Sequence, residues 1–167
     1  MKTGMFYLIF LSLTPLVAYS QLSPAEIGVM QPIHKLFEGM QKGDSAMLHS
    51  AFTKQVTLAS IGTDKEGKTF IRYESSLNDF LKAIGTPHPE AYNEMIWGEK
   101  ILIDHNFAQV WTDYAFYKGK KFSHCGVDAF HLVKEEDGTW KIFHLADTRQ
   151  KDGCNVPPAI QKKVEQL

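Results

Sequence analysis

Residues 94–149 read EMIWGEKILIDHNFAQVWTDYAFYKGKKFSHCGVDAFHLVKEEDGTWKIFHLADTR and decide the fold of the chain. β-Branched and aromatic residues dominate this stretch, and short polar turns interrupt it. Such a composition predicts consecutive antiparallel strands joined by hairpins. The predicted strands are Glu94 to Asp104, Phe107 to Tyr117, Phe122 to Lys134 and Thr139 to Arg149.

The chain ahead of these strands is predicted to be mainly helical. Apolar residues recur at helical spacing from Pro24 to Phe52 with a break at Gly43-Asp44, which indicates a long helix, a turn and a short helix capped by Asp44. Gln55–Ile61 and Thr69–Tyr73 are predicted to form a hairpin, and a third helix follows from about Ser75 to Ile84. A long curved sheet can bury the apolar faces of these helices only by wrapping around them, which predicts an α+β fold shaped like a cone.

The first 20 residues are predicted to be a secretory signal peptide. Lys2 precedes an apolar run from Phe6 to Ala18, and Ala18-Tyr19-Ser20 supplies the small residues that signal peptidase requires. The alternative is an uncleaved membrane anchor, which the short run and its Pro15 disfavour. The mature chain, from near Gln21, is therefore expected to be secreted or periplasmic and free of the membrane.

Length and charge limit the class of protein. The remaining chain of about 145 residues has the size of one domain. We expect this domain to cover residues 21–154, with residues 155–167 as a C-terminal tail. The chain has 18 Lys and Arg against 19 Asp and Glu, and the basic residues are scattered. Nucleic acid is therefore not an expected partner.

The two cysteines, Cys125 and Cys154, are predicted to form a disulfide that fastens the tail to a strand. An oxidising compartment favours such pairing. The alternative is that Cys125 is a buried thiol and Cys154 a free one. Two cysteines without CxxC spacing also argue against a structural zinc site.

Short motifs accompany the order helix, helix, hairpin, helix, strands: PIHKLFEGM at residues 32–40, Gly43-Asp44, SLNDF at 76–80 and DGTWKI at 137–142. Together they resemble the nuclear transport factor 2-like superfamily, which includes the SnoaL-like proteins, and are most similar to its secreted bacterial branch named for lumazine binding. The resemblance covers nearly the whole chain after residue 20. It implies a cone with a ligand pocket at the open end of the sheet and a homodimer through the outer sheet face. It implies no defined reaction, because one fold hosts many functions.

Alternation along the last three predicted strands sorts their side chains into two faces, provided that no bulge intervenes. One face mixes aromatic and charged residues: Trp111, Asp113, Ala115, Tyr117, Phe122, His124, Gly126, Asp128, Phe130, Phe143, Leu145, Asp147 and Arg149. The other face carries Val110, Tyr114, Phe116, Cys125, His131, Trp140, Ile142 and His144. A face that served only as core would be apolar throughout, so the mixed face is predicted to line a ligand pocket.

The mixed face also contains the candidate catalytic residues. Asp128 is the predicted general base with Asp113 as the alternative, and His124 would exchange a proton with the neighbouring carboxylate. The ligand-binding wall is predicted to comprise Trp111, Tyr117, Phe130, Asp147 and Arg149. The competing interpretation is that these polar residues form a structural network that fastens the tail.

The sequence therefore predicts a secreted or periplasmic protein that binds a small organic molecule. The alternatives are a proton-transfer enzyme of the isomerase, cyclase or dehydratase type, and a structural dimer whose cavity is too small for a ligand. No cofactor or metal is expected, because the sequence offers no dependable third metal ligand, no phosphate-binding glycine loop and no nucleophile elbow.

Overall fold

The computed structural model describes residues 21–74 and 76–167. The predicted signal peptide and Ser75, the first residue of the predicted third helix, lie outside the described residues. The elements are α1 (Pro24–Lys42), α2 (Ser45–His49), β1 (Phe52–Thr63), β2 (Thr69–Tyr73), α3 (Leu77–Gly85), β3 (Tyr92–Asp104), β4 (Phe107–Lys118), β5 (Lys121–Lys134), β6 (Trp140–Thr148) and α4 (Pro158–Glu165).

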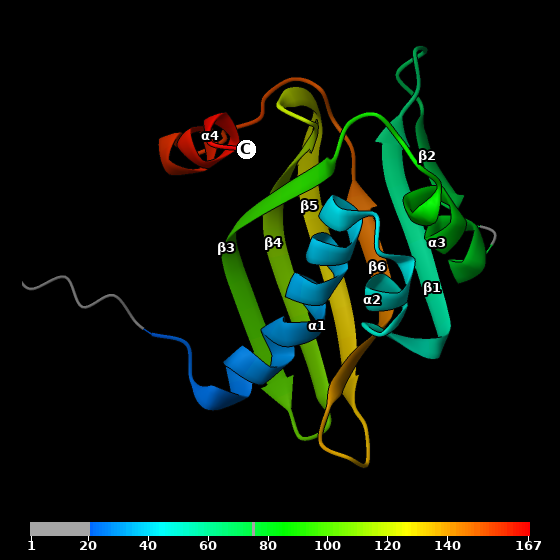
Figure 1. Ribbon diagram of the computed structural model, residues 1–167, viewed down its shortest axis with the longest axis vertical. Coiled ribbons are helices and arrows are strands. Elements are labelled where there is room, and N and C mark those ends of the chain that lie inside the picture. Colours follow the sequence, from blue (N-terminus) through cyan, green and yellow to red (C-terminus); the bar gives the residue numbers. More distant parts are fainter. Residues whose placement is uncertain (1–20, 75) are drawn as a thin grey trace, which may run out of the picture.

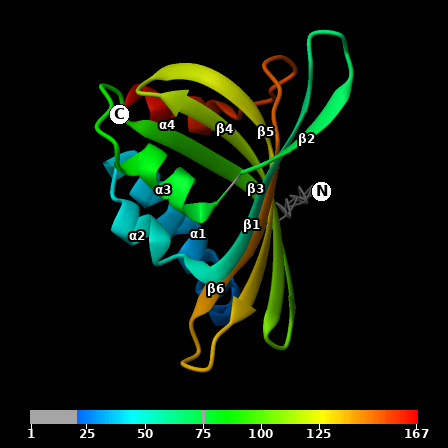
Figure 2. The same ribbon diagram turned by 90° about the vertical axis from the view of Figure 1, so that its right-hand side faces the viewer.

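A six-stranded sheet with the order β2-β1-β6-β5-β4-β3 forms the body of the molecule. Neighbouring strands are antiparallel except β1 and β6, which run parallel. The sheet curves around α1, α2 and α3, which lie on its concave side (Figures 1 and 2). The α+β cone predicted from the sequence is therefore confirmed, and so is the hairpin of β1 and β2.

Local sequence signals fix the ends of the first two helices. Ser23 and Glu26 form a capping box, in which the Ser23 hydroxyl accepts from the Glu26 amide and the Glu26 carboxylate accepts from the Ser23 amide. Asp44 caps α2 as predicted, with its Oδ1 accepting from the Met47 amide at 2.9 Å. These caps satisfy amides that have no partner within their own helix.

The core lies between α1 and the concave face of the sheet. Apolar residues of α1 and the sheet form one buried cluster, which includes Val29, Ile33, Leu36, Val110, Phe130, Leu132 and Ile142. Phe37 of α1 meets Phe130 edge to face, with ring centroids 6.2 Å apart. This packing holds α1 across the middle strands and leaves the ends of the strands to form a pocket.

Four of the strand pairs contain a register shift. Between β4 and β5, Tyr117 pairs with Phe122 but Phe116 pairs with His124, so Ser123 is an extra residue in β5. In the same way, Phe143 is an extra residue in β6. An extra residue inverts the alternation beyond it, so these bulges determine which side chains face the helices.

The C-terminal segment is more structured than the predicted tail, since it contains α4. Val164 of α4 packs against Tyr117 and Cys125 on the outer face of the sheet. The predicted disulfide between Cys125 and Cys154 is confirmed and joins this segment to β5. Within residues 21–74 and 76–167, no helix combines the length and the apolar character needed to cross a membrane.

Gly126 is required by the close approach of β6. A Cβ atom at this position would lie 1.9 Å from the Thr148 carbonyl oxygen, which accepts a hydrogen bond from the Tyr114 hydroxyl. We expect Gly126→Ala to lower the free energy of unfolding by about 1–3 kcal/mol through overpacking, as measured by urea denaturation. Gly28→Ala is the control, because the nearest atom to its Cβ is at 3.5 Å. Equal stability of the two variants would contradict the steric requirement.

The disulfide is expected to stabilise the fold. It closes a loop over a sequence separation of 29 residues, so Cys154→Ser is expected to cost about 3 kcal/mol. Urea denaturation with and without reductant measures this, and reductant should leave the variant unchanged. A wild-type protein whose stability does not respond to reduction would contradict the prediction.

Candidate functional site

Four charged side chains gather on the concave face of the sheet. Glu94 lies on β3, Asp128 on β5, Asp147 on β6 and Arg149 directly after β6. Asp128 and Asp147 are direct partners in the β5–β6 register. The bulge at Ser123 sets this geometry, because it turns His124 and Asp128 to the same side as Phe116 and Thr112 of β4.

A cavity of about 100 Å³ opens between these side chains and the helices. Its apolar walls come from α1, β1, α3 and β6, and include Leu36, Phe37, Met40, Leu58, Phe80 and Leu145. Its polar lining includes Ser60, Glu74, Glu94 and Arg149. The mixture of apolar walls and few polar groups is typical of small-molecule pockets.

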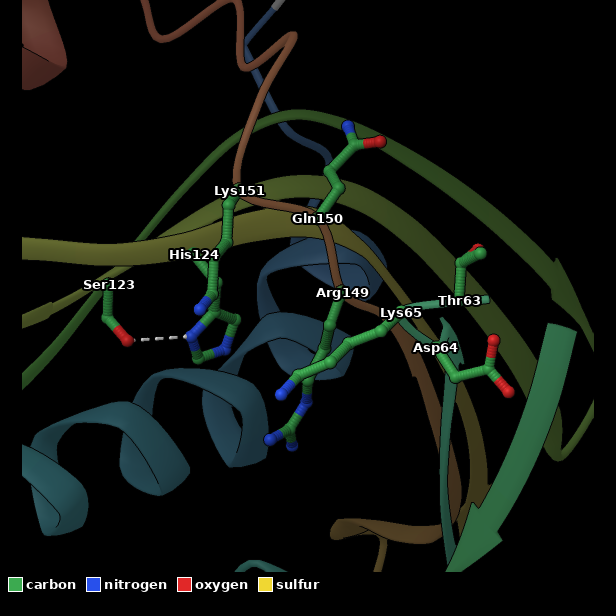
Figure 3. Close-up of a pocket in the computed structure, with 8 residues that line it drawn as sticks. All are labelled: Thr63, Asp64, Lys65, Ser123, His124, Arg149, Gln150 and Lys151. Atoms are coloured by element: carbon green, nitrogen blue, oxygen red, sulfur yellow. Dashed lines mark hydrogen bonds between the residues drawn. The ribbon is translucent and has the colours of Figure 1, made fainter. Parts of the chain in front are cut away.

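Two further hollows border the cavity. One of about 290 Å³ lies between α1 and β3 and reaches Phe37 and Glu94. The other, of about 500 Å³, lies between the β1–β2 turn, the start of β5 and the segment after β6, and shares Arg149 with the cavity (Figure 3). Glu94 therefore lies between the cavity and the first hollow, and Arg149 lies between the cavity and the second hollow.

Glu94 and Asp128 form a carboxyl pair that holds a proton. A side-chain hydrogen bond joins them, and no described residue donates to the buried Oδ2 of Asp128. Burial raises the pKa of Glu94 to about 7, although the Asp128 hydrogen bond opposes this. Burial and the charge of Glu94 raise the pKa of Asp128 well above its usual range. The pair is therefore both a donor and an acceptor near neutral pH.

Asp147 is the centre of a second polar network. Its Oδ1 accepts from the Ser60 hydroxyl at 2.6 Å, and its Oδ2 accepts from Arg149 Nε at 2.6 Å. The Tyr114 hydroxyl lies 3.3 Å from Oδ2 and also donates to the Thr148 carbonyl at 2.9 Å. Burial and the nearby carboxylates raise the pKa of Tyr114, so this side chain stays neutral.

His124 is neutral at physiological pH. Burial, followed by the positive charge of Arg149, lowers the pKa of His124 to about 4. Its Nδ1 is 3.0 Å from the Ser123 hydroxyl, and its ring packs against Phe116 and Tyr114. His124 does not touch the carboxyl pair through any hydrogen bond recorded for the described residues, so the predicted exchange of a proton with Asp128 has no direct path.

The structure brings together four of the residues that the sequence predicts on the pocket face: His124, Asp128, Asp147 and Arg149. Arg149 forms an ion pair with Asp147. Phe130 shares their face but is fully buried in the core against Phe37.

The face prediction is wrong for Trp111, Asp113 and Tyr117. These residues pair with Ala129, Val127 and Phe122 on the outer face, because Ser123 inverts the alternation between β4 and β5. Trp111 is 44% exposed, Asp113 borders an outer hollow near the disulfide, and Tyr117 is buried beneath α4. Asp113 therefore has no access to the cavity from its strand.

The bulges also explain the other errors of the face prediction. Phe143 points to the outer face, where its ring contacts Phe107 and His131. Tyr114, Phe116, Trp140 and Ile142 belong to the concave side rather than the outer face. His131 and His144 lie on the outer face as predicted, with ring centroids 5.2 Å apart.

Sequence reasoning missed Glu94, Tyr114 and Ser60. Glu94 stands near the start of β3, whose two faces we did not sort from the sequence, and β3 carries its own register shift between Trp97 and Lys100. Gly98, with φ of +69°, lies within this shift. A glycine inside a strand is the signal that could have indicated the bulge.

Across residues 21–74 and 76–167, no group of three or more His, Cys, Asp or Glu side chains is arranged to hold a metal ion.

Comparison with known proteins identifies the fold. No protein-family model matches the chain, and no curated protein matches its sequence. Among solved structures, an NTF2-like protein of unknown function from Shewanella baltica OS155 is 20% identical with a TM-score of 0.56, over 79% of this chain and 100% of that chain. The chain therefore has the nuclear transport factor 2-like fold, which confirms the predicted fold.

Two other solved structures of this fold have names that refer to reactions. A "putative ketosteroid isomerase" from Shewanella frigidimarina is 17% identical with a TM-score of 0.53, covering 72% of this chain and 94% of that chain. A "Putative Scytalone Dehydratase" from Novosphingobium aromaticivorans is 13% identical with a TM-score of 0.58, covering 78% and 88%. Many of the matched structures are of unknown function, and identities this low establish the fold alone.

The raised pKa of Glu94 predicts that stability falls with rising pH. Above its ordinary value of 4.5 the unfolded chain releases the Glu94 proton, whereas the folded protein keeps it up to about pH 7. The free energy of unfolding should therefore fall between about pH 5 and pH 8, by up to about 3 kcal/mol. In Glu94→Gln the fall should be smaller, because the contribution of Glu94 is removed and only the raised pKa of Asp128 remains.

Urea midpoints at pH 5 and pH 8 measure this dependence. Glu99→Gln is the control, since Glu99 is exposed on the same strand. A pH dependence as steep in Glu94→Gln as in the wild type would contradict the raised pKa of Glu94.

Proposed function

We propose that this protein binds a small organic molecule between α1, α3 and the concave face of the sheet. The observation that carries this proposal is that Glu94 and Arg149 line a mostly apolar cavity, while Asp128 and Asp147 contact them from outside the lining. Buried polar groups are costly unless they are paired, and such sets occur where a ligand must be oriented. A purely structural core would fill this space with apolar side chains.

The ligand is expected to be flat and to carry adjacent donor and acceptor groups. The carboxyl pair of Glu94 and Asp128 can donate and accept at once, and Phe37 and Phe80 offer aromatic walls. Lumazine, the ligand implied by the sequence resemblance, is a flat bicycle with alternating N–H and C=O groups. Because the cavity alone is small, the ligand would extend past Arg149 into the larger hollow.

We further propose that the protein works outside the cytoplasm, as a homodimer through the outer sheet face. The disulfide between Cys125 and Cys154 supports an oxidising compartment. Exposed apolar side chains on the outer side of the sheet, Leu102, Phe107 and Trp111, support a partner surface there.

A proton-transfer enzyme is the second candidate. Glu94 favours it, because a base is most effective when its pKa lies near the working pH, and burial brings the pKa of Glu94 to about 7. In this function Glu94 replaces Asp128 and Asp113 as the base, and the protonated Asp128 donates to the Glu94 carboxylate. Two of the fold's solved structures carry the names of an isomerase and a dehydratase, which agrees with this chemistry.

We expect lumazine to raise the melting temperature of the oxidised protein. At a concentration of 100 times the dissociation constant, a ligand that binds only the folded state adds about 2.7 kcal/mol. Phe37→Ala should weaken binding about tenfold, since an aromatic contact is worth about 1 kcal/mol beyond the buried area. Trp111→Ala, an aromatic truncation on the outer face, is the control and should bind normally.

Native mass spectrometry of protein purified from a periplasm tests the same site without choosing a ligand. A retained small molecule that is lost in Phe37→Ala but kept in Trp111→Ala would support the binding function. A protein that neither retains a molecule nor responds to lumazine contradicts it. Turnover of a retained compound that disappears in Glu94→Gln, with binding kept, would instead establish the enzyme.

A further inference from the structure

The hollow beyond Arg149 has a chemistry different from that of the apolar cavity. It encloses about 500 Å³ and is lined by side chains of the β1–β2 turn, the start of β5 and the segment after β6. Its lining includes three cationic residues, Lys65, Arg149 and Lys151, and one acidic residue, Asp64. A hollow lined by one predominant sign of charge concentrates ions of the opposite sign.

The acidic residue of this lining does not neutralise the cations. The Asp64 Oδ1 atom accepts from the backbone amides of Glu66 and Lys68 within its own turn. Figure 3 shows its carboxylate directed away from the side of the pocket where Lys65 and Arg149 end. Among the described residues, neither Lys65 nor Lys151 forms an ion pair. Two positive charges of the hollow are therefore without a counter-charge.

Arg149 connects this hollow to the apolar cavity, since it lines both. Its Nε donates to Asp147, and its Nη2 lies 3.5 Å from the other oxygen of the same carboxylate. A guanidinium has five N–H donors, so the remaining ones are available to a second acceptor. The Arg149 side chain is 43% exposed.

Two neutral side chains complete the polar lining of this hollow. Ser123 and His124 line the hollow, and the Ser123 hydroxyl lies 3.0 Å from Nδ1 of His124. Both the hydroxyl and the imidazole can donate to an anion. Burial, then Arg149, and further Lys151 and Lys118, lower the pKa of His124, which agrees with an excess of positive charge around its ring.

We propose that the ligand of the cone cavity carries an oxyanion, a carboxylate or a phosphate, which binds between Lys65, Arg149 and Lys151. This inference rests on the proposed binding function and specifies the class of its ligand, a ring compound with an added oxyanion. Lumazine, which has no carboxylate or phosphate, represents the ring portion alone. The ring of the ligand lies against Phe37 and Leu145, and the oxyanion lies beyond Arg149. Asp147 keeps the guanidinium in place, and Lys65 and Lys151 supply the charge that Arg149 already shares with Asp147.

Four probes test the proposal: the ring compounds benzamide, benzoate and phenyl phosphate, and inorganic phosphate without a ring. Benzoate and benzamide differ mainly in charge, so the ratio of their dissociation constants measures the oxyanion contact. We expect benzoate or phenyl phosphate to bind at least about tenfold more tightly than benzamide at low salt. The comparison between these two anions distinguishes a carboxylate from a phosphate ligand.

Lys65→Gln should weaken benzoate binding about tenfold and leave the dissociation constant of benzamide unchanged. Lys68→Gln is the matched control, because Lys68 belongs to the same turn but does not line the hollow. The pKa of His124, followed by NMR, is an independent readout. Inorganic phosphate bound in the hollow should raise it from about 4 in the wild type, and less in Lys65→Gln.

The outcomes separate this inference from the proposed function. Equal binding of benzamide and benzoate, with no effect of phosphate on His124, would overturn the oxyanion site and leave the binding function standing. A rise in the His124 pKa with phosphate, in a protein that binds none of the ring compounds, would support the anion site and contradict the proposed cavity ligand. An equal loss of anion affinity in Lys65→Gln and Lys68→Gln would mean that the anion responds only to the general positive charge, and it would overturn the proposed oxyanion site.

Discussion

The composition of the site depends on one extra residue in β5. Ser123 shifts the register between β4 and β5, and this shift turns Asp128 toward the helices while Trp111 and Asp113 turn outward. Without the shift, the aspartates of the two strands would share a face, and like charges would have to be neutralised together. The bulge therefore decides both the shape of the wall and the number of charges it carries.

Those charges are compensated within the concave face itself. Arg149 and Asp147 neutralise each other, and Ser60 and Tyr114 complete the hydrogen bonds of the Asp147 carboxylate. Glu94 and Asp128 avoid a second negative charge by keeping a proton. A buried acid without a counter-ion normally stays protonated, because desolvation penalises the ionised form. The site thus combines an ion pair with a carboxyl pair that retains a proton. This combination suits a ligand that needs both hydrogen-bond donors and hydrogen-bond acceptors from the protein.

Much of the fold follows from local sequence signals, since the hairpins, the Asp44 cap and the order of elements could all be predicted from turns and periodicity. Asp128, Asp147 and Arg149 were correctly grouped because neither extra residue, Ser123 or Phe143, lies between them in the pairing of β5 with β6. Trp111, Asp113 and Tyr117 were misplaced because a bulge at an ordinary serine has no sequence signature. Glu94 was missed because its raised pKa comes mainly from burial in the assembled fold, which no local pattern encodes.

The cross-link between Cys125 and Cys154 encloses more than the end of the chain. The ring that it closes contains β5 from Cys125 onward, all of β6 and three of the four charged residues of the site, and backbone hydrogen bonds of 2.9 Å between Cys125 and Gln150 reinforce it. Glu94 alone lies outside this ring, on β3, the strand at the edge of the sheet. The disulfide therefore ties Asp128, Asp147 and Arg149 into one covalently closed segment, and the contact of Glu94 with Asp128 joins that segment to β3.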